Sequence, residues 1–248
     1  MKKSYKTDAI VIRARDLSEN DRIITFLSPS AGKFDAVRKG AKKITSRSIG
    51  NFEPFNRINL YIAVGKSLDV VVQSKLLDTF PDIRKSLEKT TSAIYMLDLV
   101  NRYVDKREEN FSLYSLLLSC LHFLESGCDP DVVCRLFEIR FVSIMGYMPE
   151  VEKCVVCTGQ GDHPYFEYSL GGVVCEKCRS QLKEAQGRSI LPGSLQSIRF
   201  LMTRPLKSTT RFSIHPMVKN EIKEVMRRYI IFNMPGSEVN TGCYEKLK

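Results

Sequence analysis

The sequence predicts an α+β protein of several domains: a small five-stranded barrel, a helical domain, and a four-cysteine metal module inserted within the helices. Three observations predict this class. Strand-like apolar runs fill the chain before Pro81, helical periodicity follows that proline, and two closely spaced cysteine pairs interrupt the helices. The expected boundaries are 1–80 for the barrel, 81–149 for the first helical part, 150–182 for the metal module, and 183–248 for the second helical part with a C-terminal tail.

Five expected strands share alternating or continuous apolar residues and are separated by turn-forming residues. They lie at Ala9–Arg13, Ile23–Leu27, Phe34–Val37, Ile58–Val64 and Leu68–Val72. Closure of a small sheet removes its unpaired edges. Five short strands in this N-terminal segment therefore favour a closed barrel.

Apolar residues take a helical period after Pro81. The first helical pattern runs from Ile83 to Val104, and the next has Ser112 as its expected N-cap and Gly127 as its end. Three further helices are expected at Asp131–Met145, Ser194–Met202 and Met217–Phe232. The cysteines lie between the third and fourth of these five helices, so the metal module is an insertion.

Four cysteines form two Cys-x-x-Cys pairs, Cys154 with Cys157 and Cys175 with Cys178, separated by the segment Thr158–Val174. Four thiolates complete the tetrahedral shell that zinc prefers and leave no position for a catalytic water. The glycine-rich segment between the pairs cannot bury enough apolar surface to fold alone, so a metal would supply the missing free energy. We expect one structural Zn²⁺. Redox-active pairs and unliganded thiols remain the alternatives, although redox motifs usually occur singly and near a βαβ pattern.

Positive charge is concentrated in the N-terminal segment 1–80. This segment carries 15 Lys and Arg against 8 Asp and Glu, within a chain of net charge +10. One ten-residue run contains five cations and no acid: Arg38, Lys39, Lys42, Lys43 and Arg47. A polyanionic partner, most simply nucleic acid, would explain this run. The alternative is a solvated basic surface without a partner.

The sequence offers little for catalysis or for membrane insertion. The three histidines, His122, His163 and His215, are far apart and lack an obvious nucleophile partner, and no phosphate-binding glycine loop is present. We therefore expect that the protein is not an enzyme. The chain lacks a secretory pattern and any apolar run of about 18 residues, so we expect a reducing, cytoplasmic location and no membrane partner.

Several segments, taken in order between residues 5 and 178, resemble the RecO family of bacterial recombination mediators. They are Tyr5–Arg13, Glu19–Asp21 followed by Ile23–Phe26, Gly32-Lys33, Arg38–Lys43 with Ser46, Arg135–Arg140, Met145–Pro149 leading into Cys154, and Phe166 with Gly171–Cys175 and Cys178. The last seventy residues match only as a helical region.

The resemblance implies an N-terminal oligonucleotide/oligosaccharide-binding (OB) fold barrel, a helical domain and a zinc module. It also implies that the protein binds single- and double-stranded DNA, anneals complementary strands, and helps to load the RecA recombinase on DNA coated with single-strand-binding protein (SSB). The implied partners are RecR, the acidic C-terminal tail of SSB and, indirectly, RecA, in a nucleoid-associated setting. A zinc-stabilised RNA-binding or transcription-associated module remains the alternative.

Three sets of residues are candidates for binding. Phosphate contacts are expected from the basic run Arg38–Arg47, with Arg13, Arg15, Lys33 and Arg57 as flanking contacts. Base stacking needs aromatic rings, for which the candidates are Tyr5, Phe34, Phe52, Phe55 and Tyr61, each with a core position as the alternative. Candidates for the SSB tail are Arg102, Arg135 and Arg140, with an internal salt bridge to Asp98 or Glu138 as the alternative.

Overall fold

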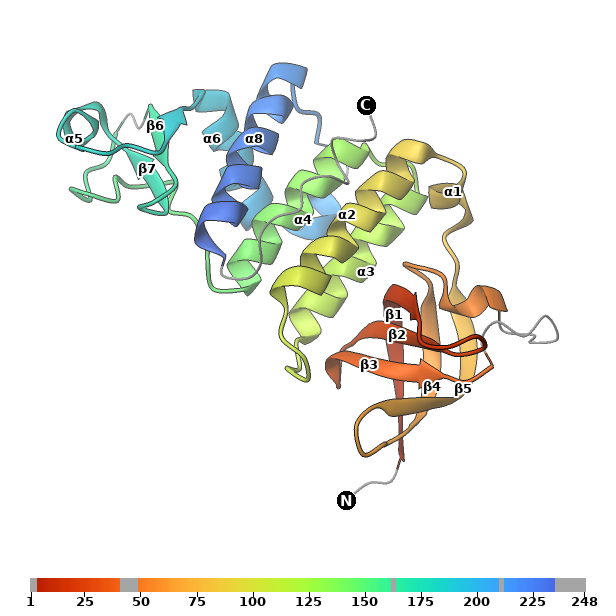
Figure 1. Cartoon of the computed structure of the whole chain (residues 1–248). Helices are drawn as coiled ribbons and strands as arrows, with labels where there is room; N and C mark the ends of the chain where they lie inside the picture. The colour runs from red at the N-terminus through yellow and green to blue at the C-terminus, as the bar shows by residue number, and fades with distance from the viewer. Residues whose placement is uncertain (1–3, 41–48, 162–163, 210–211, 235–248) are drawn as a thin grey trace. The chain divides into compact units, whose positions relative to one another are not determined.

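The computed structural model describes residues 4–40, 49–161, 164–209 and 212–234. The chain divides into two compact units, Met1–Phe137 and Glu138–Lys248. The first contains the barrel and the first helices, and the second contains the four paired cysteines and the C-terminal helices (Figure 1).

Five strands close into a barrel in the order β1-β2-β3-β5-β4, and β4 pairs back to β1. Their bounds are β1 Ser4–Asp16, β2 Arg22–Ser28, β3 Gly32–Arg38, β4 Arg57–Ala63 and β5 Asp69–Asp78. Each expected strand overlaps one of them. Only the β3–β5 pair is parallel, and it is short, joining Ala36 and Val37 to Asp69 and Val70. The predicted closed barrel is confirmed, and a five-stranded barrel of this kind is an OB fold.

The barrel interior is filled by alternate residues of every strand, because successive side chains of a strand point to opposite faces. Ile24 and Phe26 of β2 pack with Phe34 of β3, Leu60 of β4 and other buried residues. The 3-10 helix η1 (Ile49–Phe52) adds Phe52 to this core.

Four helices follow the barrel: α1 Pro81–Arg84, α2 Leu87–Tyr103, α3 Phe111–Glu125 and α4 Pro130–Ile144. Two sequence expectations need correction. The pattern from Ile83 to Val104 is broken, because the Ser86 side chain accepts a hydrogen bond from Lys89 N and starts α2 as a separate helix. The N-cap of α3 is Asn110 and not Ser112, since the Asn110 side chain accepts from Leu113 N at 2.8 Å.

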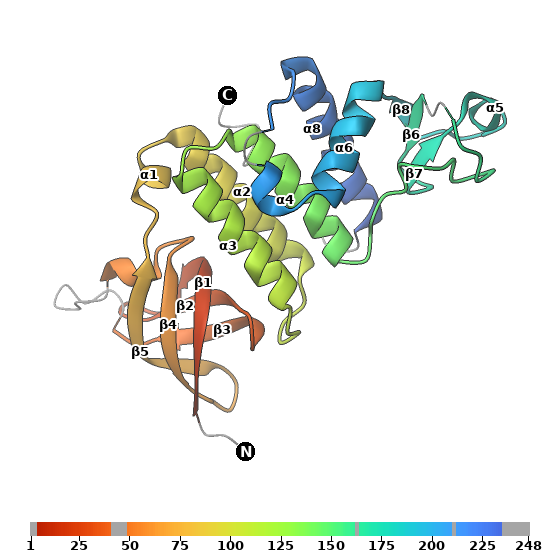
Figure 2. The same cartoon turned by 180° about the vertical axis from the view of Figure 1, so that it is seen from behind.

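Helices α2 and α3 contact each other, and they also contact β1 and β2 respectively. Both views show them beside the barrel (Figures 1 and 2). The loop after α2 extends this contact: Arg107 N donates to Lys33 O at 2.8 Å, where β3 has no partner in β5. Barrel and helices α1–α3 therefore belong to one compact unit.

Two buried barrel carboxylates hold the loop after α2. Asp35 accepts from Lys106 Nζ at 2.8 Å, and Asp69 accepts from Arg107 Nη2 at 2.6 Å. Tyr5 Oη also donates to Asp69, at 2.9 Å. Opposite charge and hydrogen bonding compensate the desolvation of these carboxylates.

The second unit combines a small sheet with helices. Its sheet has the order β7-β6-β8, and the remaining bounds are β6 Tyr165–Glu167, β7 Gly172–Val174, α5 Glu176–Arg179, β8 Arg188–Ser189, α6 Pro192–Thr203, α7 Leu206–Thr209 and α8 Pro216–Asn233. Helix α8 is tied to the sheet by Asn233 Nδ2, which donates to Tyr168 O at 3.0 Å. No helix within the described ranges is long and apolar enough to cross a membrane.

Candidate metal centre and nucleic-acid surface

Two backbone turns present the four paired cysteines. In the first, Thr158 N donates to Cys154 O at 2.8 Å, and Thr158 takes a left-handed conformation with φ 57°. In the second, Cys175 follows β7 directly and caps the short helix α5, which carries Cys178. The β6–β7 hairpin therefore brings together two pairs that are distant in sequence.

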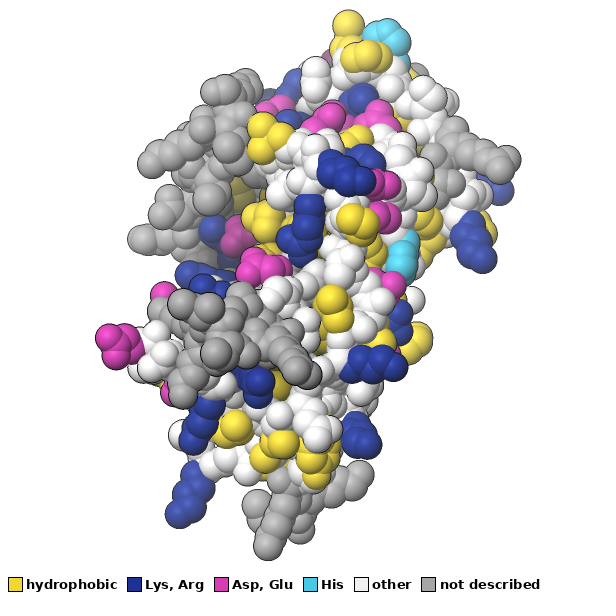
Figure 3. All heavy atoms as spheres, turned by 90° about the vertical axis from the view of Figure 1, so that its right-hand side faces the viewer, with side chains coloured by type: hydrophobic (Ala, Val, Ile, Leu, Met, Phe, Trp, Pro, Cys, Tyr) yellow, Lys and Arg dark blue, Asp and Glu magenta, His cyan; other side chains and the backbone are white. Residues whose placement is uncertain are grey.

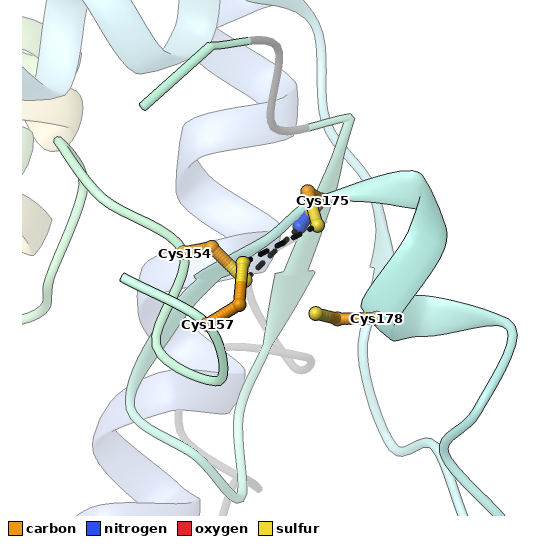
Figure 4. A group of neighbouring side chains, drawn as sticks. All are labelled: Cys154, Cys157, Cys175 and Cys178. Atoms are coloured by element: carbon orange, nitrogen blue, oxygen red, sulfur yellow. Dashed lines mark hydrogen bonds between the residues drawn. The ribbon is translucent and has the colours of Figure 1, made fainter. Parts of the chain in front are cut away.

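The four sulfur atoms lie within 4.8 Å of one another. Their side chains point toward a common centre (Figure 4), and Cys157 Sγ is 3.9 Å from Cys175 Sγ. A tetrahedral ion with metal–sulfur bonds of about 2.3 Å requires sulfur–sulfur separations of about 3.8 Å. The donor set therefore fits a tetrahedral metal ion.

The local electrostatics favour one thiolate. Burial opposes ionisation of Cys154, but amide hydrogen bonds from residues 157, 175 and 156 lower the pKa of its thiol to about 6. Hydrogen bonding with the Cys175 thiol, followed by burial, raises the pKa of Cys178 to about 12. A metal would displace the remaining protons, because thiolates are the ligating form.

All four donors come from the protein, so this set holds an ion without offering it a reactive position. Cys154 and Cys178 are buried with Val174, while Cys157 is exposed. The arrangement can close a loop-rich segment around a small core. It therefore suits a structural ion.

The basic run begins at the end of β3. Arg38 Nη1 donates to Val71 O of β5 at 3.4 Å, and Lys39 is exposed. The other three cations of the run, Lys42, Lys43 and Arg47, lie outside the described residues. After the run, Asn51 Nδ2 contacts Ser74 Oγ of β5 at 3.4 Å. Both described flanks of the run are thus attached to β5.

The predicted flanking contacts differ in their surroundings. Arg13 and Arg15 are exposed on β1. Arg57 forms ion pairs with Asp8 at 3.0 Å and Asp78 at 3.1 Å, so two carboxylates balance its charge.

Lys33 does not occupy the surface position that a phosphate contact requires. It is 6% exposed, and its Nζ donates to Asn101 O of α2 at 2.6 Å. Burial, followed by repulsion from Lys106, lowers its pKa. The expectation that Lys33 reaches DNA disagrees with this position, because the ammonium group is held against α2.

Comparison with known proteins decides the family. The family model described as Recombination protein O N terminal matches residues 1–80, and the one described as Recombination protein O C terminal matches residues 84–238. The chain belongs to the RecO family.

Curated relatives cover nearly the whole chain. The chain is similar to the DNA repair protein RecO of Pelotomaculum thermopropionicum, with 36% identity over 94% of this chain and 90% of the relative. DNA repair protein RecO of a Roseiflexus species is 33% identical over 91% and 80%, and that of Desulforamulus reducens is 30% identical over 99% and 95%. RecO membership assigns the chain to DNA repair and recombination.

Most aromatic candidates for RecO-type base stacking belong to the core. Phe34, Phe52 and Phe55 are 3% exposed or less, as the alternative interpretation expects. Tyr5 is partly exposed, but its hydroxyl group is bound to Asp69. Tyr61 is also partly exposed, on the outer face of β4.

The three candidate cations for an SSB tail are largely engaged within the protein. Arg102 pairs with Asp98 at 2.7 Å, the internal salt bridge given as the alternative. Arg135 is 2% exposed, which disagrees with a role in binding a tail from solvent. Arg140 donates to Arg204 O, and burial lowers its pKa.

Sequence reasoning did not identify the cations that hold the loop after α2, Lys106 and Arg107. Nothing in a short polar loop signals that its charges meet buried carboxylates. The sequence did carry a signal for the side of the barrel that the helices contact. The residues Ile23–Leu27 form a nearly continuous apolar run, which is typical of a strand buried on both faces.

Proposed function

We propose that this RecO-family protein is a recombination mediator. It binds single- and double-stranded DNA, anneals complementary strands and, together with RecR, helps to load RecA on SSB-coated DNA. The observation that carries the proposal is the acid-free basic run Arg38–Arg47, which follows a strand of an OB barrel. OB barrels commonly bind oligonucleotides, and contacts from lysine and arginine to phosphates carry no sequence preference.

Annealing follows from this kind of contact. The protein has to reduce repulsion between two phosphate backbones while leaving the base edges free to pair. Lysine and arginine contacts to phosphates screen the charge and read no sequence. A mediator of this kind needs no covalent chemistry, so we propose that it is not an enzyme. Strand cleavage by the purified protein with magnesium would overturn that part of the proposal.

We further propose that the metal is one structural Zn²⁺ ligated by Cys154, Cys157, Cys175 and Cys178. Soft thiolates and tetrahedral spacing favour zinc over the hard cations Mg²⁺ and Ca²⁺. Metal analysis of reduced protein should find about one equivalent of zinc per chain. Less than half an equivalent would contradict the assignment.

The proposed protein partners are RecR, the SSB tail and, indirectly, RecA. An acidic tail needs a cation that solvent can reach, and Arg135 is too buried to supply one. Arg102 and Arg140 are partly exposed and remain the candidates. Binding of an SSB tail peptide that survives Arg102→Ala and Arg140→Ala would remove both.

Strand annealing on SSB-coated DNA, with and without RecR, tests the proposal. Replacing Arg38, Lys39, Lys42 and Lys43 with Ala should lower annealing and reduce the salt slope of single-strand binding by about 3, or about 0.7 per lost phosphate contact. The control replaces four exposed lysines elsewhere, for the same change in net charge: Lys85, Lys153, Lys177 and Lys183. Equal slopes for the two variants would contradict the role of the basic run. Competition between single-stranded DNA and RNA of equal length tests the RNA-binding alternative.

A further inference from the structure

The face that OB folds commonly use for nucleic acid is covered here. That face is formed by β2 and β3. On β2, the residues that alternate with the core are Ile23, Thr25 and Leu27, and they are 8% exposed or less. On β3, the corresponding residues Lys33 and Asp35 are 6% and 8% exposed. Both faces of these two strands are therefore buried.

The cover belongs to the same compact unit. Helix α3 contacts β2, and Asn101 of α2 and Lys106 of the following loop bind Lys33 and Asp35. Removing this cover would break these hydrogen bonds and expose the apolar residues Ile23 and Leu27 of β2 to water. A strand of nucleic acid cannot lie on this face while the contacts persist.

The opposite side of the barrel has an outer face that solvent reaches. On β4 the buried residues Ile58, Leu60 and Ile62 alternate with partly exposed ones, and Tyr61 is the aromatic among these. Cross-strand partners lie directly opposite one another on the same face of a sheet. Tyr61 is flanked by Lys6 of β1 on one side and Gln73 of β5 on the other, both exposed.

Two lysines lie on the same face as this ring. Lys6 Nζ is 5.9 Å from the Tyr61 ring centroid, and exposed Lys75 lies one cross-strand row further along, opposite Asn59. The two carboxylates in neighbouring rows, Asp8 and Asp78, are both paired with Arg57. In Figure 3, basic and apolar side chains lie together on the lower part of the molecule, where the barrel is.

We propose that a single-stranded nucleic acid crosses this β1–β4–β5 face, with a base stacked on Tyr61 and phosphates bound by Lys6 and Lys75. The inference rests on the proposed DNA-binding function and identifies the surface for it. The described ends of the basic run, Arg38 and Asn51, both form hydrogen bonds to β5. Stacking on an aromatic ring and phosphate contacts from lysines are what a single strand needs.

Fluorescence anisotropy with a labelled oligothymidine and with a duplex of equal length tests this surface. Tyr61→Leu should weaken binding of the single strand about 5- to 150-fold, the equivalent of one lost stacking contact. It should change duplex binding by less than twofold, because paired bases cannot stack on the ring. Tyr61→Phe keeps the ring and loses only the hydroxyl group, which lies 2.9 Å from Ser4 Oγ. Because stacking needs only the ring, this variant should bind the single strand like the native protein.

The control is Phe111→Leu, which removes another exposed aromatic ring from the same unit and should leave binding unchanged. Lys6→Gln and Lys75→Gln should each reduce the single-strand salt slope by about 0.7. Native binding by Tyr61→Leu, or an equal loss for single strand and duplex, overturns the proposed surface. If the native protein binds neither nucleic acid, the proposed function itself fails, and the two failures are thus distinguishable.

Discussion

Replacing Asp35 with Ala would test how strongly the barrel holds the loop after α2. Its side chain is 7% exposed, and it accepts from Thr25 Oγ1 at 2.7 Å and from Lys106 Nζ at 2.8 Å, with Arg15 Nη2 at 3.9 Å. Burial acts to raise the pKa of this carboxyl group, but the hydrogen bonds from Lys106 and Thr25 outweigh it and hold the pKa below its usual range. The charged form is therefore the stabilised one.

The expected cost of Asp35→Ala is the sum of two unequal parts. The Lys106 side chain is 61% exposed and regains water, so its ion pair contributes at most about 1 kcal/mol. Thr25 is 8% exposed, and its hydrogen bond to a charged group contributes about 1.5–3 kcal/mol. We expect the free energy of unfolding of the first unit to fall by about 1.5–4 kcal/mol.

Urea dependence of hydrogen exchange in peptides from β2 and β3 measures this loss. Asp16→Ala is the matched control, because Asp16 pairs with Arg22 on the surface and its loss should cost less than about 1 kcal/mol. The folded pKa of Asp35 is lowered, so its contribution is present above the unfolded value of about 3.9 and is lost as the pH falls through the folded value. The difference between native protein and Asp35→Asn should therefore narrow from pH 5 toward pH 2. Equal losses for Asp35→Ala and Asp16→Ala would refute the reasoning.

Three further predictions concern the cysteine module and the loop after α2. Chelation should raise hydrogen exchange in residues 150–182 before the barrel opens, and simultaneous opening of the module and the barrel would contradict this expectation. Cys157→Ser should weaken metal retention, whereas Cys128→Ser should not. Glu167→Ala should destabilise the module by about 3 kcal/mol in the same assay. The reason is that this carboxylate is 1% exposed and accepts hydrogen bonds from Gln186 N and Gly187 N at 2.9 and 3.0 Å. Glu176→Ala removes an exposed carboxylate and should have little effect. Gly32→Ala should lower the melting temperature, since φ is +62° and a Cβ would lie 2.1 Å from Glu108 O, whereas Gly50→Ala meets nothing within 4 Å. Equal melting temperatures for these two variants would argue against the tight approach.

The strands and most helices were predictable because their apolar periods are local properties of the sequence. All five barrel strands and helices α4, α6 and α8 lie where those periods place them. The cysteine centre was predictable for a similar reason, since two Cys-x-x-Cys turns need only one hairpin to bring them together. The N-cap of α3 was misplaced by two residues, because Asn110 and Ser112 are both good caps and only the hydrogen bond to Leu113 distinguishes them.

The cover on the barrel depends on contacts between distant segments, and local patterns do not encode them. Lys33 has the sequence context of a surface cation beside a turn, yet a carbonyl of α2 receives its ammonium group. The role of Lys106 depends likewise on a carboxylate 71 positions away. The charge of Lys33 therefore predicts a DNA contact, and only the fold shows that its ammonium group is bound to a carbonyl group of α2.

These buried charges also limit how the barrel can use DNA. Lys33 and Asp35 lie on the β2–β3 face, and their partners lie on α2 and on the loop after it. Separating the helices from the barrel would break these hydrogen bonds and expose the apolar residues Ile23 and Leu27 of β2 to water. We therefore expect the barrel and its helices to bind DNA as one body. The strand then has to use the side of the barrel that the helices leave exposed, where Tyr61 lies.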